Sequence, residues 1–526
     1  MRNNGSRPLA LLAMSLVAAV ALAASPAGAS SPSEADARLR TSAPMARRVV
    51  TAPGLDRHAT SRIRPAAEES SRTTFRGIGP TTVFSFDAIG RIGGNWPADP
   101  TGAVSDTWYF TAVNTHYALY DLTGAETLGP TSFAGLFDLP AGTQVFDPKV
   151  VYDPYGDTFV LAFLGVNDAQ QRSWILVVTI PDATADQRST WCGTKIGGDR
   201  TSGDGKQWPD YPGLGFSGDR VTISTNQFHF SGGAFGSAQI LSFPKDNLYE
   251  CSREVSFDTF AGSDTRNPSG TQAFTILPAI SAGSPPGSQF LVSLDEGKPA
   301  SLVVWRIKPS ADGASLKRAA LPLGGKVSIA PYGTQCDGSL QRSDTWWDPG
   351  DLRFVTAFYD ADRERLFAAH PIAKDIGPDP QTGGYVESVV RWYEVRPATK
   401  LAGSDVMRRG VIGEPESDVG WPALATDVDG NLIVAYSQAS APNDECLSAR
   451  AAQVLHEQTA ASTVLLVPGE ARTEAIKGPE RWGDYAAAVR DPVDGTRVVL
   501  IDQYAAADGG QTTIDWQQIV YVLTAG

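Results

Sequence analysis

Short apolar runs bounded by turn residues recur along most of the chain. Near the C-terminus, residues 486–489 and 498–501 are apolar and flank the segment Asp491-Pro492-Val493-Asp494-Gly495. Proline presets φ, glycine accepts a positive φ and aspartate bonds to its own backbone, so this segment predicts a tight turn. The flanking runs are short and rich in small, β-branched and aliphatic residues, which favours strands over helices. The pattern predicts a β-hairpin.

This hairpin unit recurs along the chain and makes seven modules in all. Each module opens with a lip of aromatic, proline or acidic residues, followed by a strand, a turn and two further strands. The lips are Trp96-Pro97-Ala98-Asp99-Pro100, Phe146-Asp147-Pro148, Trp208-Pro209-Asp210-Tyr211, residues 276–280, Trp347-Asp348-Pro349, Trp421-Pro422 and Arg481-Trp482-Gly483-Asp484-Tyr485. A module of about 45 to 75 residues has the scale of a propeller blade with insertions.

The closure of the ring can also be predicted. Six modules show a fourth, outer strand, and the seventh lacks one because the chain ends. An isolated strand at residues 81–86 would supply it and remove both open edges. The sequence therefore predicts an all-β fold, a seven-bladed β-propeller closed by an N-terminal strand. Six blades remain the alternative if the fourth and least regular module is something else.

The N-terminus has the features of a secretory signal. Arg2 and Arg7 precede an apolar run at residues 9–24, and Ala27-Gly28-Ala29 is a small-residue cleavage site. We expect a signal peptide at 1–29, a disordered leader or propeptide at 30–78 and the propeller at 79–526. The apolar run is too short and too rich in alanine to span a membrane, and no other stretch could do so. We expect a secreted, extracellular monomer without a membrane span.

The charge is uneven along the chain. Through Arg76 there are 11 basic and 5 acidic residues, a net charge of +6, whereas the remainder has 33 basic and 53 acidic residues, a net charge of −20. Binding to phosphate backbones needs a basic face, so the acidic body excludes nucleic acid as a partner. An acidic body is compatible with the binding of cations or neutral glycans, or with a role in solubility alone.

Four cysteines are compatible with disulfides in an exported protein. They are Cys192, Cys251, Cys336 and Cys446, which permit three pairings. We favour a bond between Cys192 and Cys251 because both would flank one module. The alternative is four buried, reduced thiols.

The lips of different blades should meet, because inner strands of a propeller begin around its axis on one face. Asp99, Asp147, Asp210 and Asp484 then converge, and polar residues at the ends of second strands join them, namely Asn226, Gln227, His370 and Gln503. Converging carboxylates repel one another and need a cation, shared protons or a polar ligand.

Three interpretations of this ring compete. In the first, Asp147, Asp210 and Asp484 are catalytic carboxylates, and Trp96, Trp208, Trp421, Trp482, Asp99 and the four polar residues bind a sugar. In the second, Asp147 and Asp484 coordinate Ca2+. In the third, the aspartates cap backbone N–H groups and the tryptophans pack between blades. Repetition across modules favours the third interpretation for most of these residues.

Several other chemistries lack their motifs. The chain has five histidines, no H-E-x-x-H and no close Cys/His cluster, which argues against zinc. It also lacks a G-x-S-x-G elbow, a phosphate-binding loop and a dinucleotide fingerprint, so we expect no nucleotide or redox cofactor.

Taken together, these motifs resemble a broad group of secreted bacterial β-propeller proteins, mostly without an assigned activity. The resemblance rests on the lips at Trp96–Pro100, Asp147-Pro148 and Arg481–Tyr485, together with Asp210-Tyr211-Pro212 and Thr225-Asn226-Gln227-Phe228. It covers about residues 80 to 526 and implies a fold rather than a chemistry. Asp147-Pro148 is also similar to the inner-strand acid of five-bladed glycosidases such as arabinanases, although the blade count differs.

From these observations we expect a protein that engages an extracellular glycan or cell-envelope polymer at an Asp-lined mouth, as a binder or as a glycoside hydrolase or lyase. The alternatives are a non-catalytic scaffold for protein partners and a calcium-binding propeller hydrolase.

Overall fold

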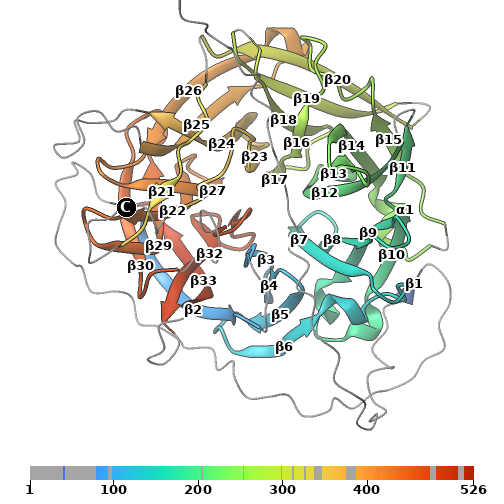
Figure 1. Cartoon of the computed structure of the whole chain (residues 1–526), viewed down its shortest axis with the longest axis horizontal. Helices are drawn as coiled ribbons and strands as arrows, with labels where there is room; N and C mark the ends of the chain where they lie inside the picture. Colours follow the sequence, from blue (N-terminus) through green and yellow to red (C-terminus); the bar gives the residue numbers. More distant parts are fainter. Residues whose placement is uncertain are drawn as a thin grey trace, which may run out of the picture.

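The structure is a computed structural model with seven small antiparallel sheets arranged in a ring (Figure 1). It describes residues 40–41, 79–92, 97–202, 205–252, 254–297, 299–310, 313–324, 327–336, 346–374, 387–473, 481–507 and 514–526. The prediction of an all-β, seven-bladed propeller is confirmed. The predicted signal peptide at 1–29 lies outside the described residues, as does the leader at 30–78 apart from strand β1 (Arg40–Thr41).

Each blade meanders outward from an inner strand near the axis, and within a blade consecutive strands pair in antiparallel order. Blade 1 contains β3 (Thr101–Val104), β4 (Trp108–Val113), β5 (His116–Asp121) and β6 (Glu126–Ser132). Blade 2 contains β7 (Gln144–Asp153), β8 (Thr158–Asn167), β9 (Arg172–Pro181) and β10 (Cys192–Gly197), with β1 parallel to β10. Blade 3 contains β11 (Arg200–Ser202), β12 (Gly205–Phe216), β13 (Arg220–His229), β14 (Phe235–Pro244) and β15 (Asp258–Ala261).

The fourth module is a true blade, which rules out the six-bladed alternative. Blade 4 contains β16 (Phe274–Pro278), β18 (Gln289–Asp295), β19 (Ser301–Ser310) and β20 (Gly313–Pro322). The chain that leaves β16 crosses over as β17 (Ile280–Ala282), which pairs in parallel with β23 of blade 5. This crossing explains the irregular pattern of the module, because one apolar run serves two sheets.

The last three blades complete the ring. Blade 5 contains β23 (Thr356–Asp360), β24 (Arg365–Lys374), β25 (Glu387–Arg396) and β26 (Asp405–Ile412). Blade 6 contains β27 (Asp418–Thr426), β28 (Leu432–Ser440), β29 (Glu445–Val454) and β30 (Ser462–Gly469). Blade 7 contains β31 (Ala487–Arg490), β32 (Arg497–Ala507) and β33 (Ile514–Thr524).

The N-terminal strand closes the seventh blade as predicted. β2 (Thr81–Gly90) runs antiparallel to β33, with Thr81 opposite Thr524 and Gly90 opposite Gln517. Figure 1 shows the blue β2 beside the red β33. Closure by strands from opposite ends of the chain removes an open sheet edge and makes the ring depend on both termini of the domain.

The hydrophobic core lies between blades. Blades 2 and 3 bury one such layer, in which Leu164 and Ile175 share a cluster with Ile223 and Phe243. Middle strands such as β8 are buried on both faces, so their sequences read as continuous apolar runs rather than as alternating ones. Packing of this kind fixes the angle between blades and thereby the position of the residues at the axis.

The remaining elements are short. They are the 3-10 turns η1 (Phe133–Gly135), η2 (Asp182–Thr184), η3 (Arg188–Thr190) and η4 (Leu401–Gly403), the helix α1 (Lys245–Tyr249) and the two-stranded pair of β21 (Gly333–Thr334) and β22 (Trp346–Trp347). In the described part of the chain, no helix is long and apolar enough to cross a membrane.

Two disulfides join distant segments. Cys192 is bonded to Cys251, which confirms the favoured pairing, and Cys336 is bonded to Cys446. The first bond ties the outer strand of blade 2 to the segment that follows α1 of blade 3. The second ties the end of the β21 segment to β29 of blade 6.

Candidate functional site

The inner strands of five blades share a backbone conformation where they start. One residue in each of five blades has a left-handed φ of about 50°, namely Asp99, Asp147, Tyr211, Thr275 and Trp421. In all but Thr275 the next residue is proline. The strand register shifts at this point in β7, β12, β16 and β27, which marks a β-bulge. The bulge bends the strand and aims the lip toward the axis.

The bulge corrects the predicted alignment of two acids. The sequence pattern set Asp210 and Asp484 in the same slot as Asp99 and Asp147. The structure places Tyr211 in that slot in blade 3, and Asp210 lies one residue earlier. In blade 7, Tyr485 stands two residues before the first paired residue of β31, as Asp99 does in blade 1, so Asp484 is also one residue early. The constant feature of the slot is the proline that follows it in four blades, which pattern matching on aspartate missed.

The four predicted aspartates nevertheless come together, and we call them the acid cluster (Asp99, Asp147, Asp210 and Asp484). Oδ1 of Asp99 accepts the N–H of Asp484 at 2.8 Å, which joins blades 1 and 7. Oδ2 of Asp147 accepts the N–H of Tyr211 at 3.2 Å and the hydroxyl of Tyr485 at 3.0 Å. Two carboxylates thus cap backbone N–H groups of other blades, as the third interpretation of the sequence expected.

Asn114 links the two capping carboxylates. Its Nδ2 donates to Oδ2 of Asp99 at 2.5 Å, and its Oδ1 accepts the N–H of Asp147 at 2.9 Å. Asn226 plays the same part between blades 3 and 4, because its Oδ1 accepts the N–H of Thr275 and its Nδ2 donates to the Thr275 hydroxyl. Asn114 directly follows β4, Asn226 lies in the last part of β13, and each holds the bulge residue of the next blade.

Two tyrosines beside the acid cluster make a contact across the axis of the ring. The ring of Tyr211 of blade 3 packs at a tilt of 45° against that of Tyr485 of blade 7, with centroids 5.0 Å apart, and its hydroxyl donates to the carbonyl of Asp484 at 3.3 Å. These blades are not neighbours in the ring, so the contact must pass through its centre. Both tyrosine rings are buried, and they fill the axis at this end of the inner strands.

Burial and mutual repulsion favour the protonated form of two members of the acid cluster, Asp99 and Asp147. Burial, together with the charge of Asp484, raises the pKa of Asp99 to about 7. Burial raises the pKa of Asp147 well above its usual range, and Asp210, Asp99 and Asp484 add to the effect. Acids in such an environment stay protonated at pH values at which ordinary aspartates ionise. Raised pKa values of this kind occur in functional sites as well as in structural networks.

Three cations that the sequence analysis overlooked surround these acids. Arg481 pairs with Oδ2 of Asp484, and 42 % of its side chain is exposed, so the site reaches solvent there. Lys149 Nζ lies 3.2 Å from the ring centroid of Tyr485, and burial lowers its pKa to about 7 against the pull of the nearby acids. Arg481 lies in the lip of blade 7 and Lys149 directly follows Asp147-Pro148, so both were adjacent to the motifs already recognised.

The third cation comes from blade 5. Nε of Arg353 donates to both oxygens of Asp351 and Nη2 donates to Oδ2, each at 2.9 Å or less. The guanidinium lies 4.2 Å from the ring centroid of Tyr211. Burial acts to raise the pKa of Asp351, but the paired guanidinium outweighs it and holds that pKa below the usual range. Arg353 thus keeps one ionised acid beside the cluster.

An aromatic shelf adjoins the acid cluster on the same face. It consists of the half-buried rings of Phe146, Trp208, Phe230, Phe235 and Phe274 around the buried Phe228. Trp208 lies 6.2 Å from Phe146 and 6.5 Å from Phe230, and Phe235 lies 5.0 Å from Phe274, between centroids. The Arg353 guanidinium covers Phe274 at 4.7 Å and so connects the shelf to the acids.

Other predicted ligands lie in the interior. Trp482 has no exposed surface, and its indole N–H donates to Ser437 Oγ at 2.9 Å, so its ring packs between blades and offers no face to a sugar in this conformation. The indole N–H of Trp421 donates to the carbonyl of Asp348. Trp96 lies outside the described residues.

Three predicted polar ligands are also buried. Gln503 donates to the carbonyl of Trp482 at 2.6 Å, and Gln227 donates to Gln239 Oε1 at 2.7 Å. His370 is bonded to the carbonyl of Leu352, and burial lowers its pKa to about 4, so it stays neutral. All three side chains are buried, and Gln503 also holds the lip of blade 7 through the Trp482 carbonyl.

The calcium site predicted at Asp147 and Asp484 stays a prediction, and a different group of carboxylates is spaced for a metal ion. Among the described residues, the group of three or more possible metal ligands that lie within reach of one ion is Asp106, Asp157 and Asp182. Asp106 follows β3, whereas Asp99 precedes it, so this group lies at the opposite end of the inner strands.

Comparisons with known proteins give matches among solved structures only. No protein-family model matches the sequence, and no curated protein does. The GH93 α-L-arabinofuranosidase of Fusarium graminearum, in complex with arabinobiose, is 8 % identical over 84 % of this chain and 97 % of that chain, with a TM-score of 0.37. The endo-arabinase from Bacteroides thetaiotaomicron is 16 % identical over 64 % and 95 %, with a TM-score of 0.29.

A third similar structure comes from a different kind of protein. Extracellular domains 1–2 of Drosophila Semaphorin 1b are 9 % identical over 85 % of this chain and 88 % of that chain, with a TM-score of 0.36. Similarity this low supports no argument about the function of the present chain, so the proposal below rests on the site.

Proposed function

We propose that this propeller is an exported protein that binds an extracellular glycan or cell-envelope polymer across the aromatic shelf and the acid cluster, and hydrolyses a glycosidic bond there. The observation that carries the proposal is the continuity of two features on one face. Half-buried rings offer apolar faces to sugar rings, and carboxyl groups next to them offer hydrogen bonds to hydroxyls. The two disulfides suit an oxidising, extracellular location.

The chemistry follows from the unequal environments of the acids. Glycoside hydrolysis uses one carboxyl group that is still protonated near neutral pH and one carboxylate. Asp147 is kept protonated by burial and by its acidic neighbours, which suits a proton donor to the leaving oxygen. Asp484 faces the partly exposed Arg481 and suits the carboxylate, which activates water or attacks the anomeric carbon. The charge of the neighbouring Asp210 raises the pKa of Asp147 further, so Asp210 helps to keep the proton donor protonated.

The experiment is a binding and turnover assay on defined polysaccharides. Arabinan, xylan, mixed-linkage β-glucan and peptidoglycan are tested with the mature protein, and both retention and the release of reducing ends are measured. We expect Asp484→Asn and Asp147→Asn each to lower turnover about 100-fold or more, the usual size of an acid–base contribution, while binding changes little. Asp138→Asn, at an exposed position between η1 and β7, is the matched control and should behave as the parent.

Thermal melts of the same variants separate chemistry from folding. A loss of turnover at an unchanged melting temperature supports the acids as catalytic. Parent-like turnover in both variants, or no binding of the parent to any of the polysaccharides, would overturn the proposal and favour a scaffold for protein partners.

A further inference from the structure

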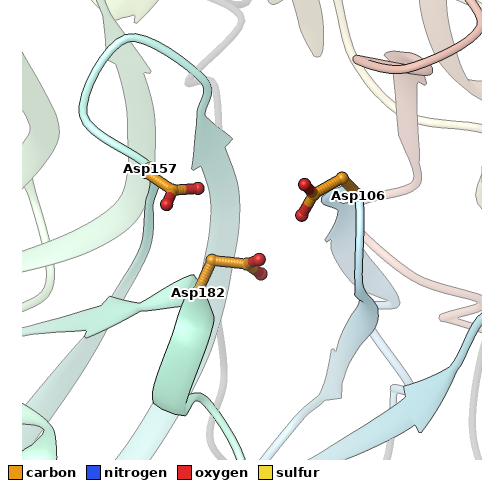
Figure 2. A group of neighbouring side chains, drawn as sticks. All are labelled: Asp106, Asp157 and Asp182. Carbon is orange, nitrogen blue, oxygen red and sulfur yellow. The ribbon is translucent and has the colours of Figure 1, made fainter.

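Three carboxylates meet at the junction of blades 1 and 2, at the end of the inner strands opposite the acid cluster. Asp106 lies in the turn between β3 and β4, Asp157 in the turn between β7 and β8, and Asp182 at the start of η2 directly after β9. Figure 2 shows the three carboxylates pointing toward a common space. One oxygen from each lies within 4.8 Å of the others.

The buried member of this triad lacks a partner for one of its oxygens. Asp182 is only 3 % exposed, and its Oδ1 has no hydrogen-bond partner. Burial raises the pKa of Asp182 to about 6; the hydroxyls of Ser105 and Thr107 oppose the shift, and Asp106 adds to it. A carboxylate oxygen left unsatisfied in the interior costs free energy, which a bound cation would remove.

Within the described residues, no lysine or arginine forms an ion pair with any of the three acids. Hydroxyl groups instead donate hydrogen bonds to the carboxylates and fix them in place. The Tyr152 hydroxyl donates to Oδ1 of Asp157 at 2.7 Å, and the Thr107 hydroxyl donates to Oδ1 of Asp106 at 2.9 Å. The triad is therefore a locally uncompensated negative site.

Backbone contacts hold the triad together across the blade junction. The N–H of Asp182 donates to the carbonyl of Asp157 at 3.1 Å, and the indole N–H of Trp108 donates to the carbonyl of Asp182 at 3.2 Å. Trp108 belongs to blade 1 and the two aspartates belong to blade 2. The carboxylates are thus positioned before any ion arrives, which lowers the entropic cost of binding one.

We propose that Asp106, Asp157 and Asp182 bind a calcium ion that clamps blade 1 to blade 2. Calcium takes oxygen ligands at 2.3–2.6 Å, so two ligands of one ion lie at most about 5 Å apart, a limit that the triad meets. Asp106 and Asp157 are exposed, which leaves room for water to complete the coordination. With three carboxylates and an open side, the affinity should fall in the range of extracellular modules, about 10⁻⁴–10⁻³ M.

The test uses the full mature protein, freed of metal with a chelator and dialysed. Calcium chloride alone is titrated by calorimetry, and thermal melts are recorded with and without calcium. We expect calcium to raise the melting temperature of the parent. Asp106→Asn, an exposed change that leaves folding intact, and Asp182→Asn, which preserves the shape of the buried side chain, should each weaken calcium binding tenfold or more.

Two controls locate the ion. Asp219→Asn alters an exposed aspartate in the equivalent turn of blade 3 and should leave binding unchanged. Asp484→Asn alters the acid cluster and should also leave it unchanged. Terbium, a calcium mimic, should show emission sensitised by the nearby Trp108 and Tyr152 rings in the parent and not in Asp106→Asn.

The outcomes are distinct. The absence of any calcium effect on the parent, or an effect that survives both Asp106→Asn and Asp182→Asn, overturns the proposal. An effect abolished by Asp484→Asn alone also overturns it and places the ion in the acid cluster. Because the readout is binding and stability, the result does not depend on whether the glycan proposal holds.

Discussion

At the scale of single residues, Asp99 and Asp147 combine two roles that the sequence left as competing alternatives. Each carboxyl group caps a backbone N–H of another blade, and each also has a pKa raised by burial and by neighbouring acids. A structural cap and a proton reservoir are compatible at Asp147, because its Oδ2 accepts both hydrogen bonds and a proton can reside on Oδ1. Repetition of aspartate along the chain therefore does not by itself decide between structure and chemistry.

Asp502 of β32 gives a prediction for the dependence of stability on pH. It is 2 % exposed, its Oδ2 has no hydrogen-bond partner, and burial raises its pKa to about 7. Between about pH 4 and pH 7 the unfolded chain ionises this group while the folded chain keeps it protonated. The folded state then binds more protons, so the free energy of unfolding falls as pH rises, by about 1.4 kcal/mol per pH unit for one such group.

Asp502→Asn removes this titration. We expect the free energy of unfolding of the variant, measured by chemical denaturation, to exceed that of the parent at pH 8 and to lose the advantage toward pH 4. A difference between the two proteins that does not vary with pH would show that Asp502 is ionised in the folded state.

At the scale of elements, the inner strands depend on a bulge more than on a particular side chain. Aspartate, tyrosine, threonine and tryptophan all occupy the left-handed position, and proline follows in four of the five cases. The turns and strands of the modules were predictable from local chemistry. The one-residue offset of Asp210 and Asp484 was not, because a bulge changes the register without changing the apolar pattern.

The closing strand β2 can be tested through Phe86. Its ring is buried against Tyr109 and Tyr120 of blade 1, at centroid distances of 5.3 and 5.1 Å. Phe86→Ala should lower the free energy of unfolding by about 3–5 kcal/mol, the usual cost of removing a buried phenylalanine ring. Val83→Ala in the same strand is the control, because Val83 is 46 % exposed and should cost no more than about 0.5 kcal/mol.

Equal losses in the two variants, measured by the same chemical denaturation, would mean that β2 contributes little through packing. The strand would then close blade 7 mainly through its backbone bonds to β33.

At the scale of the whole molecule, the ring joins segments that are far apart in sequence. Blade 7 unites both ends of the domain, and the disulfides span 59 and 110 residues. Such long-range connections cost much chain entropy on folding, so covalent links that restrict the unfolded chain should matter here.

The bond between Cys336 and Cys446 is the larger of these links. We expect the double change of Cys336→Ser and Cys446→Ser to lower the free energy of unfolding by about 2–5 kcal/mol, because it releases a 110-residue loop in the unfolded chain. The midpoint of urea unfolding checks this, and the pair of changes at Cys192 and Cys251 is the comparison. An unchanged midpoint would show that the unfolded chain is already restricted without the bond.

The sequence by itself determined the class of fold, the seven modules and the closing strand, since hairpins and strand patterns are encoded within short stretches of chain. Only the tertiary structure decided which side chains meet. Tyr211 and Tyr485 touch across the axis, Arg353 reaches them from blade 5, and Asp106 joins Asp182 at a blade junction. These contacts depend on the curvature of the ring and on the angle between blades, which arise from packing between sheets and leave no local pattern in the sequence.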